Sequence, residues 1–250
     1  MKPEREQILR EMGLGPVWKL RVPTAAMPVE EVVAPPPATA MPLPEAAPTI
    51  APVPGVASMA PPGATAWDEL AVTVAACRKC SLCEARKQAV LGVGDRNADW
   101  LFVGEGPGAE EDQRGEPFVG QAGKLLDNML AAIGLKRGDD VYIANAVKCR
   151  PPENRTPTPE ETATCRPYLE RQIELIRPKL IVALGRPAAQ TLLQTEIKIA
   201  AARGKLHDYD GIPLIVTYHP AYLLRTLPDK ARAWEDLCFM RQTMRQRKGA

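Results

Sequence analysis

Histidine, phenylalanine and long apolar runs are scarce in this 250-residue chain. No stretch approaches the ~18–20 apolar residues that a membrane-spanning helix needs, which excludes an integral membrane protein. The first residues, Met1–Glu6, are not followed by an apolar segment, so we expect no cleaved secretion signal and a cytoplasmic protein. A net charge of +2 neither requires nor excludes a polyanionic partner. With 45% hydrophobic and 25% charged residues, the composition is that of an ordinary globular protein.

Proline, in contrast, is abundant and concentrated near the N-terminus. Residues 1–64 hold 14 of the 26 prolines, and the stretch 32–63 is almost wholly small, apolar or proline residues with Glu45 as its one charge. Such a segment cannot bury enough surface to offset the entropy of folding. We therefore expect a disordered Pro/Ala-rich tail over 1–64, with a short amphipathic helix possible over 5–14, and a folded domain over 65–250.

Short apolar runs alternate with helical patterns after residue 64. Four runs have the length and flanks of buried strands, at 100–103, 141–144, 180–184 and 212–217. Helical spacing or helix-start signals indicate helices that begin near 67, 125, 159, 187 and 229. This alternation predicts an α/β fold with a mostly parallel, doubly wound sheet, in which functional residues gather at the carboxyl ends of the strands.

Polar or glycine-rich loops follow each predicted strand. The first loop reads Gly104-Glu-Gly-Pro-Gly108, which is neither of the usual phosphate-binding patterns, and three carboxylates follow it. A dinucleotide or triphosphate site is therefore disfavoured. Of the two histidines, His207 is expected in a turn with no catalytic role. His219 lies between the end of a strand and Pro220, and here a functional role is favoured.

Six cysteines are the strongest sign of a bound group. Cys77, Cys80 and Cys83 form C-x-x-C-x-x-C, and Cys149, Cys165 and Cys238 follow at long intervals. Four thiolates suit an iron–sulfur cluster or a structural zinc ion, and this spacing leans toward iron–sulfur. Cys238, between Leu237 and Phe239, is expected to be an ordinary core residue.

Several of these strings resemble family 4 uracil-DNA glycosylases, the iron–sulfur branch of that superfamily. The matching segments occur in the family's order over residues 75–240; they are Cys77-x-x-Cys80, Gly104–Gly108, Pro117-Phe-Val-Gly120, Asn145–Pro152, Cys165 and His219-Pro-Ala-Tyr-Leu-Leu-Arg225. The resemblance implies a three-layer α/β/α domain and a 4Fe–4S cluster on Cys77, Cys80, Cys149 and Cys165. Cys83 would then be a spare thiol.

The resemblance also implies a reaction and the residues that perform it. Uracil in DNA, single- or double-stranded, would be flipped into a pocket and released by hydrolysis of its glycosidic bond. Phe118 would stack on the base, Asn145 would pair with its O4 and N3–H, and His219 would donate to O2. Glu105 would position water or stabilise the cationic sugar, beside Gly106, which occupies the slot of an aspartate in related branches. Glu111 would exclude the thymine methyl group, unless Glu110 and Glu111 merely start a helix.

The segment after His219 resembles the family's intercalation loop. Leu223 or Leu224 would fill the gap left by the flipped base, while the other packs on the core. Phosphate-contact candidates are the basic residues of the strand-end loops; these are Lys124, Lys148, Arg150, Arg155 and Arg225. The protein is expected to act as a monomer.

Other classes of protein remain open at this stage. One is a non-catalytic iron–sulfur module for electron transfer or redox sensing, although it leaves Asn145, Phe118 and His219 unexplained. Another is a zinc-stabilised nucleic-acid-binding domain. Within the superfamily, a glycosylase that also acts on deaminated purines is the nearest rival, together with the branch that becomes covalently trapped on DNA.

Overall fold

The computed structural model describes residues 64–249, and the possible helix over 5–14 lies outside them. Six strands form one sheet in the order β1-β3-β2-β4-β6-β5. Its centre consists of four parallel strands; these are β3 (Val141–Asn145), β2 (Trp100–Gly104), β4 (Leu180–Leu184) and β6 (Ile212–Thr217). The expected mostly parallel sheet is therefore confirmed, with all four predicted strands in it.

Two antiparallel strands at the edges of the sheet were not predicted. They are β1 (Val93–Gly94), which pairs with β3, and β5 (Leu206–Tyr209), which pairs with β6. The expectation that His207 lies in a turn is wrong, because it lies within β5 opposite Leu214. Its Nε2 lies 2.9 Å from the carbonyl oxygen of Ala202, which gives the ring a structural role.

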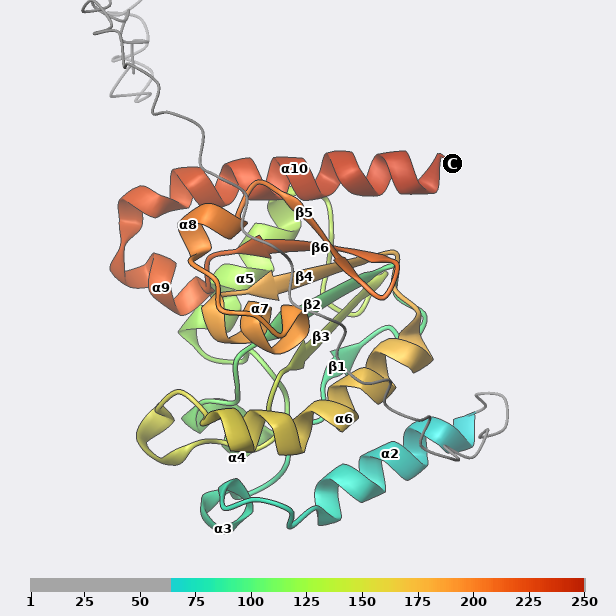
Figure 1. Ribbon diagram of the computed structural model, residues 1–250, viewed down its shortest axis with the longest axis vertical. Helices are drawn as coiled ribbons and strands as arrows, with labels where there is room; N and C mark the ends of the chain where they lie inside the picture. The colour runs from blue at the N-terminus through green and yellow to red at the C-terminus, as the bar shows by residue number, and fades with distance from the viewer. Residues whose placement is uncertain (1–63, 250) are drawn as a thin grey trace, which may run out of the picture. The chain divides into compact units, whose positions relative to one another are not determined.

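Helices cover both faces of the sheet, which gives the three layers of Figure 1. One face packs against α2 (Ala64–Ala76), α6 (Pro159–Ile176) and α7 (Arg186–Leu193). The other packs against α5 (Gln121–Ala132), α9 (Pro220–Arg225) and α10 (Lys230–Lys248). Alternate residues of each strand point to opposite faces, so Leu101 and Val103 join the first core and Trp100 and Phe102 the second.

Local sequence signals account for the helix boundaries. Thr158 Oγ1 accepts a hydrogen bond from Glu161 N at 3.2 Å, and the Glu161 carboxylate accepts one from Thr158 N at 2.8 Å. This capping box, with Pro159 in the first turn, starts α6 where the sequence predicts it. The shorter elements are α3 (Leu82–Ala85), α4 (Ala109–Arg114), α8 (Ile199–Ala202) and the 3₁₀ turns Pro152–Asn154 and Leu227–Asp229.

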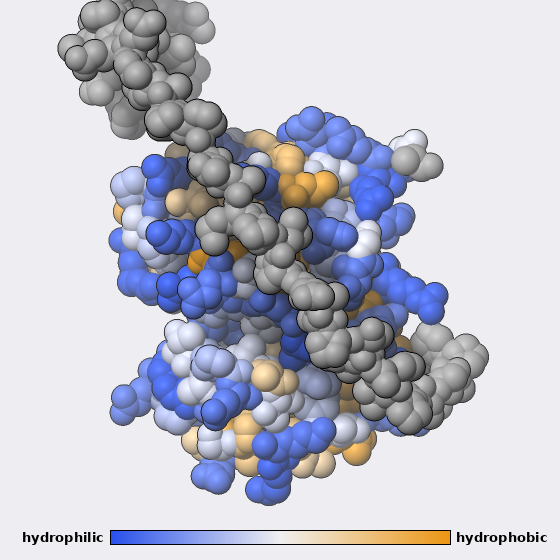
Figure 2. All heavy atoms as spheres, in the orientation of Figure 1, coloured by the Kyte–Doolittle hydropathy of each residue, from blue (hydrophilic) through white to orange (hydrophobic). Residues whose placement is uncertain are grey.

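The described helices include none long and apolar enough to cross a membrane. The face of the folded part drawn in Figure 2 is largely hydrophilic, with small separate hydrophobic patches. Large exposed apolar side chains are few among the described residues and include Leu224, Leu227 and Trp234.

Candidate active site

A cavity of about 850 Å³ lies at the carboxyl ends of the parallel strands. Sheets of this type bind ligands at this edge, where the chain passes from one side of the strand order to the other, here between β2 and β4. The cavity brings together residues that are up to 120 positions apart in the sequence, as expected from the strand-end loops. Those of the predicted site residues that line it are Glu105, Gly106, Glu111, Phe118, Asn145, Arg155, His219 and Arg225.

Asn145, the last residue of β3, is the most informative side chain of the cavity. It is only 2% exposed, and its Oδ1 has no hydrogen-bond partner within the described residues. A buried amide oxygen left without a partner is costly in a protein that binds nothing, so this oxygen points to a ligand that donates a hydrogen bond. Gly104 allows the close packing here, because a Cβ at that position would lie 2.5 Å from both Asn145 Oδ1 and Phe118 Cζ.

Phe118 faces the same cavity from an irregular segment between α4 and α5. Its φ of 55° is unusual for a residue with a large side chain, so the surrounding structure must hold it. Arg137 does so by donating to the carbonyl oxygens of Pro117 and Phe118, both at 2.8 Å. Gly123 is required next to it, since a Cβ there would lie 1.7 Å from Phe118 O.

Glu111, on α4, also holds this segment in place. Its carboxylate accepts hydrogen bonds from the backbone amides of Gly108, Val119 and Gly120, at 3.1, 2.9 and 3.0 Å. Glu110 is exposed near the start of α4. The contact with Gly108 N agrees with the alternative that Glu111 starts a helix. The Glu111 side chain also lines the cavity.

His219 caps α9, and its environment determines which ring nitrogen carries the proton. Nδ1 accepts a hydrogen bond from Ala221 N at 3.1 Å, so in the neutral ring the proton is on Nε2. Burial lowers the pKa of His219 to about 4, and the positive charge of Arg225 acts in the same direction. The ring centroid lies 5.5 Å from that of Phe118. The cavity thus holds a neutral imidazole beside an aromatic ring, and no residue among those described accepts a hydrogen bond from its Nε2–H.

This lowered pKa predicts a particular dependence on pH. The folded protein binds a proton at His219 more weakly than the unfolded chain, whose histidine has a pKa near 6.5. The unfolded state therefore gains protons first, and the His219 contribution to stability is lost as the pH falls from about 6.5 to about 4. We expect thermal melting to show this loss in the wild type and not in His219→Gln. An equal loss in both proteins would contradict the lowered pKa.

Glu105 and Gly106 directly follow β2, and both line the cavity. Burial raises the pKa of the Glu105 carboxyl, while Thr156 and the charge of Arg186 oppose this shift. A Cβ at Gly106 would lie 2.8 Å from Val147 Cγ2, so an aspartate there would require Val147 to move. Glu105 is the first residue after β2, so the carboxylate at this strand end comes directly before Gly106.

Lys148 was predicted to contact phosphate, and that prediction is wrong. Its side chain is 1% exposed, and its ammonium group donates to Asn145 O at 2.7 Å and to Gln172 Oε1 at 2.5 Å. A buried cation is stable only with such partners. Lys148 therefore positions the backbone that carries Asn145.

The leucines after His219 have different environments. Leu223 is 1% exposed and packs in the core below α9, so it is the leucine of the predicted pair that packs on the core. Leu224 is 41% exposed and remains the candidate. Of the arginines, Arg155 forms a bidentate pair with Glu161 at 2.7 and 2.8 Å, and Arg150 donates to Asn154 Oδ1 at 2.8 Å. Both remain predictions as phosphate contacts.

Five cysteines converge on a second, small pocket between α2, α3 and α6. Its lining includes Cys77, Cys80, Cys83, Cys149 and Cys165. Donors approach the two buried sulfurs: Arg86 Nη1 lies 2.7 Å from Cys149 Sγ, and Lys148 N lies 3.2 Å from Cys165 Sγ. Sulfurs bound to a metal group carry negative charge, which such donors would stabilise, so the donor set fits an iron–sulfur cluster. Cys238 is half-buried on α10, outside this group.

Among residues 64–249, no group of three His, Cys, Asp or Glu side chains is arranged to hold a metal ion. Four thiolates suit an iron–sulfur cluster or a structural zinc ion.

Comparison with known proteins places the chain in a family. Residues 91–238 match the model of the uracil DNA glycosylase superfamily. The chain is 50% identical over 165 residues to a type-4 uracil-DNA glycosylase of Archaeoglobus fulgidus, covering 63% of this chain and 82% of the relative. The corresponding enzyme of Thermotoga maritima is 48% identical over 158 residues, covering 62% and 82%. A type-5 uracil-DNA glycosylase of Pyrobaculum aerophilum is 36% identical over 146 residues, covering 52% and 64%.

The chain belongs to the type-4 branch of the uracil-DNA glycosylase superfamily. The match to the superfamily model contains every predicted cavity residue as well as Cys149 and Cys165. Cys77, Cys80 and Cys83 lie before it. The resemblance seen in the sequence motifs is therefore confirmed, and so is the fold expected from it.

Sequence reasoning missed several residues that line the cavity or support it. Arg186, Tyr218 and Tyr222 line the cavity, and Arg137 supports Phe118 from outside it. Tyr222 lies within the motif His219–Arg225, and Arg186 directly follows Gly185 at the end of β4, so their positions gave a signal. Arg137 gave none, since its contact depends on the packing of two separate loops.

Proposed function

We propose that the chain is a monofunctional DNA glycosylase that hydrolyses the bond between uracil N1 and deoxyribose C1′ and leaves an abasic site for base excision repair. The observation that carries this proposal is the unpartnered Oδ1 of buried Asn145 beside Phe118 and His219. Uracil inside a duplex is inaccessible, so the base must be flipped into the cavity. Because its proposed substrate is DNA, we also propose that the protein acts at the nucleoid in the cytoplasm.

Asn145 provides the means to recognise uracil. Its Oδ1 accepts a hydrogen bond from uracil N3–H, and its Nδ2 donates to O4. Cytosine presents an acceptor at N3 and donors at its exocyclic amine, so each pair would be mismatched. A mismatch would leave buried polar groups without partners, which makes the discrimination strong. Phe118, held by Arg137 and Glu111, stacks on the base.

His219 supports departure of the base. The C1′–N1 bond breaks with its electron pair passing to uracil, and negative charge develops on O2 as the sugar becomes cationic. The Nε2–H of neutral His219 donates to O2 and stabilises this charge. Water then forms a bond to C1′ and gives up a proton, either to the Glu105 carboxylate or through solvent to the uracil anion. Glu105 positions that water or stabilises the cationic sugar. The raised pKa of Glu105 favours proton acceptance.

The rim of the cavity supplies contacts with the rest of the DNA. Leu224 fills the space that the flipped base leaves, and Arg225 binds phosphate, with Arg150 and Arg155 as further phosphate contacts. Glu111 fixes the wall beside Phe118 through three backbone amides, which helps to exclude the C5 methyl group of thymine.

We further propose that Cys77, Cys80, Cys149 and Cys165 bind a 4Fe–4S cluster. When bound, the cluster would link these four residues rather than supply redox chemistry in turnover. Its ligands come from the segment after α2, the loop after β3 and α6, so they connect the loop next to Asn145 to the rest of the fold. Arg86 and the backbone of Lys148 donate to two of the sulfurs.

The cysteine assignment can be tested with a matched pair of variants. Cys77→Ala should lose the visible absorbance of the cluster and lower the melting temperature, because one of four ligands is removed. Cys83→Ala should keep both, although Cys83 lines the same pocket. Iron content, visible absorbance and thermal melting measure these effects. Loss of absorbance in Cys83→Ala would show that the ligand set is different.

The N-terminal 1–64 segment is proposed to be a disordered tether that the reaction does not need. Ala64, the last residue of that predicted segment, already belongs to α2, so the deletion removes residues 1–63 and cuts no described helix. We expect the shortened protein to release uracil from a short oligonucleotide at close to the full-length rate. A large loss of rate would mean that the tail takes part in DNA binding or folding.

The function itself is tested by measuring base release from oligonucleotides. Single-stranded DNA with one uracil and a U·G duplex are incubated with the cluster-loaded, full-length protein, and abasic sites are detected by alkaline strand cleavage. Cleavage confined to uracil, with a thymine oligonucleotide uncut, is expected. No cleavage would favour a non-catalytic iron–sulfur or DNA-binding module, and release of deaminated purines would indicate a broader glycosylase.

A further inference from the structure

Part of the cavity has no role in the reaction proposed above. At about 850 Å³ it lies near the upper end of the range for small-molecule pockets, and a single-ring base would leave much of it unfilled. Phe118, Asn145 and His219 account for the flipped base. Two further aromatic side chains, Tyr218 and Tyr222, line the same cavity.

These two tyrosines form a stack. Their ring centroids are 5.3 Å apart, and the planes are inclined by 13°. Tyr218, at the end of β6, is 7% exposed, whereas Tyr222 on α9 is half-buried. Tyr222 is therefore the ring of the two that can still contact a ligand, and Tyr218 packs against it.

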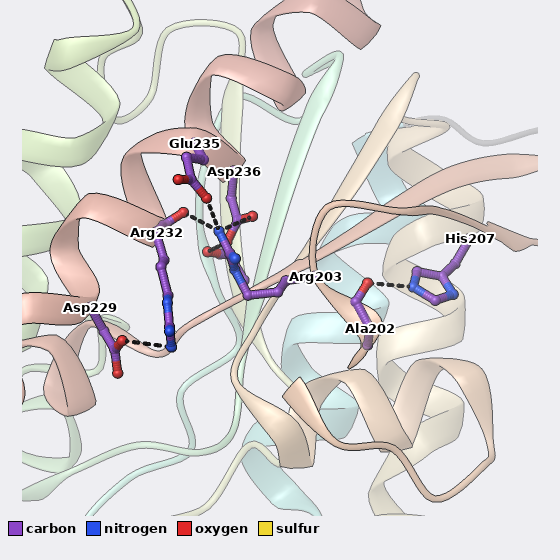
Figure 3. Close-up of polar contacts among 8 residues, drawn as sticks. Ala202, Arg203, His207, Asp229, Arg232, Glu235 and Asp236 are labelled. Carbon is purple, nitrogen blue, oxygen red and sulfur yellow. Dashed lines mark hydrogen bonds and ion pairs between the residues drawn. The ribbon is translucent and has the colours of Figure 1, made fainter. Parts of the chain in front are cut away.

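A buried ion pair supports Tyr218 in turn. The Arg203 guanidinium lies 5.6 Å from the centre of the Tyr218 ring, a cation–π contact. Arg203 is held by the carboxylates of Asp236 and Glu235, each at 3.0 Å, and by the carbonyl oxygen of Arg232 (Figure 3). Since these partners come from α10, the guanidinium is fixed before any ligand binds.

The hydroxyl end of Tyr222 is fixed as well. It donates to Asp229 Oδ2 at 2.6 Å, and Asp229 pairs with Arg232 at 3.1 Å (Figure 3). The Tyr222 ring is thus held by its stacking on Tyr218 and by its own hydroxyl group. A ring ordered in this way loses little further entropy on binding, and the charge of Asp229 is offset by Arg232.

We propose that Tyr222 is a stacking platform for the nucleobase next to the flipped uracil, so that the cavity takes two consecutive nucleotides of one DNA strand. This proposal rests on the proposed function and extends its substrate site. Aromatic rings stack on any base, so the subsite would bind without a sequence preference. Arg225, three residues along α9, lines the same cavity and is placed to bind a phosphate of this strand.

The test measures coupling between the ring and the neighbouring base. Affinity is measured by fluorescence anisotropy with single-stranded oligonucleotides that carry 2′-fluoro-2′-deoxyuridine, which resists glycosidic cleavage. In three further oligonucleotides, the base 5′ of the uracil, the base 3′ of it, or both are replaced by an abasic spacer. Because stacking on an aromatic ring accounts for about 5- to 150-fold in affinity, one spacer position should weaken binding to the wild type by a factor in this range.

The variants determine whether Tyr222 is responsible. Tyr222→Ala should weaken binding of the intact oligonucleotide by the same factor, and the spacer should then cause no further loss. Tyr222→Phe keeps the ring and should retain the sensitivity to the spacer. Tyr222→Leu keeps apolar bulk without a ring and should lose the sensitivity to the spacer. This variant shows that the loss in Tyr222→Ala does not come from a folding defect.

Two results would overturn the proposal. One is a wild type that binds all four oligonucleotides equally well, and the other is an equal spacer effect in the wild type and Tyr222→Ala. Both are binding results and do not depend on catalysis. Failure of the proposed function would instead appear as absent uracil release in the wild type.

Discussion

Asn145→Asp is expected to lower the rate of uracil release by about 10²- to 10⁴-fold in single-turnover experiments. The substitution keeps the size of the side chain and replaces the donor at Nδ2 with a second acceptor oxygen. The ionised carboxylate would face uracil O4 with nothing to donate, inside a site where Asn145 is 2% exposed. The free energy lost is that of a mismatched, buried and charged pair, which exceeds that of an ordinary hydrogen bond.

A matched control separates this effect from a general effect of added charge. Asn97→Asp makes the same chemical change at an exposed position of the turn before β2, outside the cavity lining. It should release uracil at the wild-type rate. Both variants should retain the cluster absorbance, which reports that the fold around Cys149 is intact. Near-normal release by Asn145→Asp would remove this residue from base recognition.

The central part of the fold could be predicted because its signals are local. Each parallel strand is a short apolar run buried on both faces, and the capping box at Thr158 marks the start of α6 by itself. The edge strands have no such signal. β1 has two residues, and β5 alternates exposed and half-buried positions with a polar sequence that includes His207 and Asp208. Their strand conformation comes from pairing with β3 and β6, which the local sequence does not reveal.

For the candidate site, too, the sequence indicates which residues come together but not how deeply each side chain is buried. Strand ends determine which loops meet, so Asn145, Glu105 and His219 could be assigned to one site from their places after three strands. Burial of a side chain depends on neighbours that are distant in sequence. Lys148 looks like an exposed basic loop residue until Gln172 of α6 is placed beside it. Leu223 and Leu224 differ only in which side of α9 faces the core.

His219→Ala is expected to reduce the single-turnover rate of uracil release by about 10²- to 10³-fold, with a smaller change in DNA affinity. This is the usual effect of removing one donor to an oxygen that becomes negatively charged in the transition state. The donor is already oriented in the structure, since the contact between Nδ1 and Ala221 N leaves the proton on Nε2. Because uracil O2 gains its charge only as the glycosidic bond breaks, the loss should appear in the chemical step.

The chain offers its other histidine as the control. His207→Ala removes an imidazole from β5, outside the cavity lining, and should leave the chemical step unchanged. A second substrate strengthens the argument: 5-fluorouracil is a more acidic base, so its anion departs with less help. The rate difference between the wild type and His219→Ala should therefore be smaller for 5-fluorouracil than for uracil. An equal difference for both bases would mean that His219 only shapes the pocket and does not stabilise the departing anion.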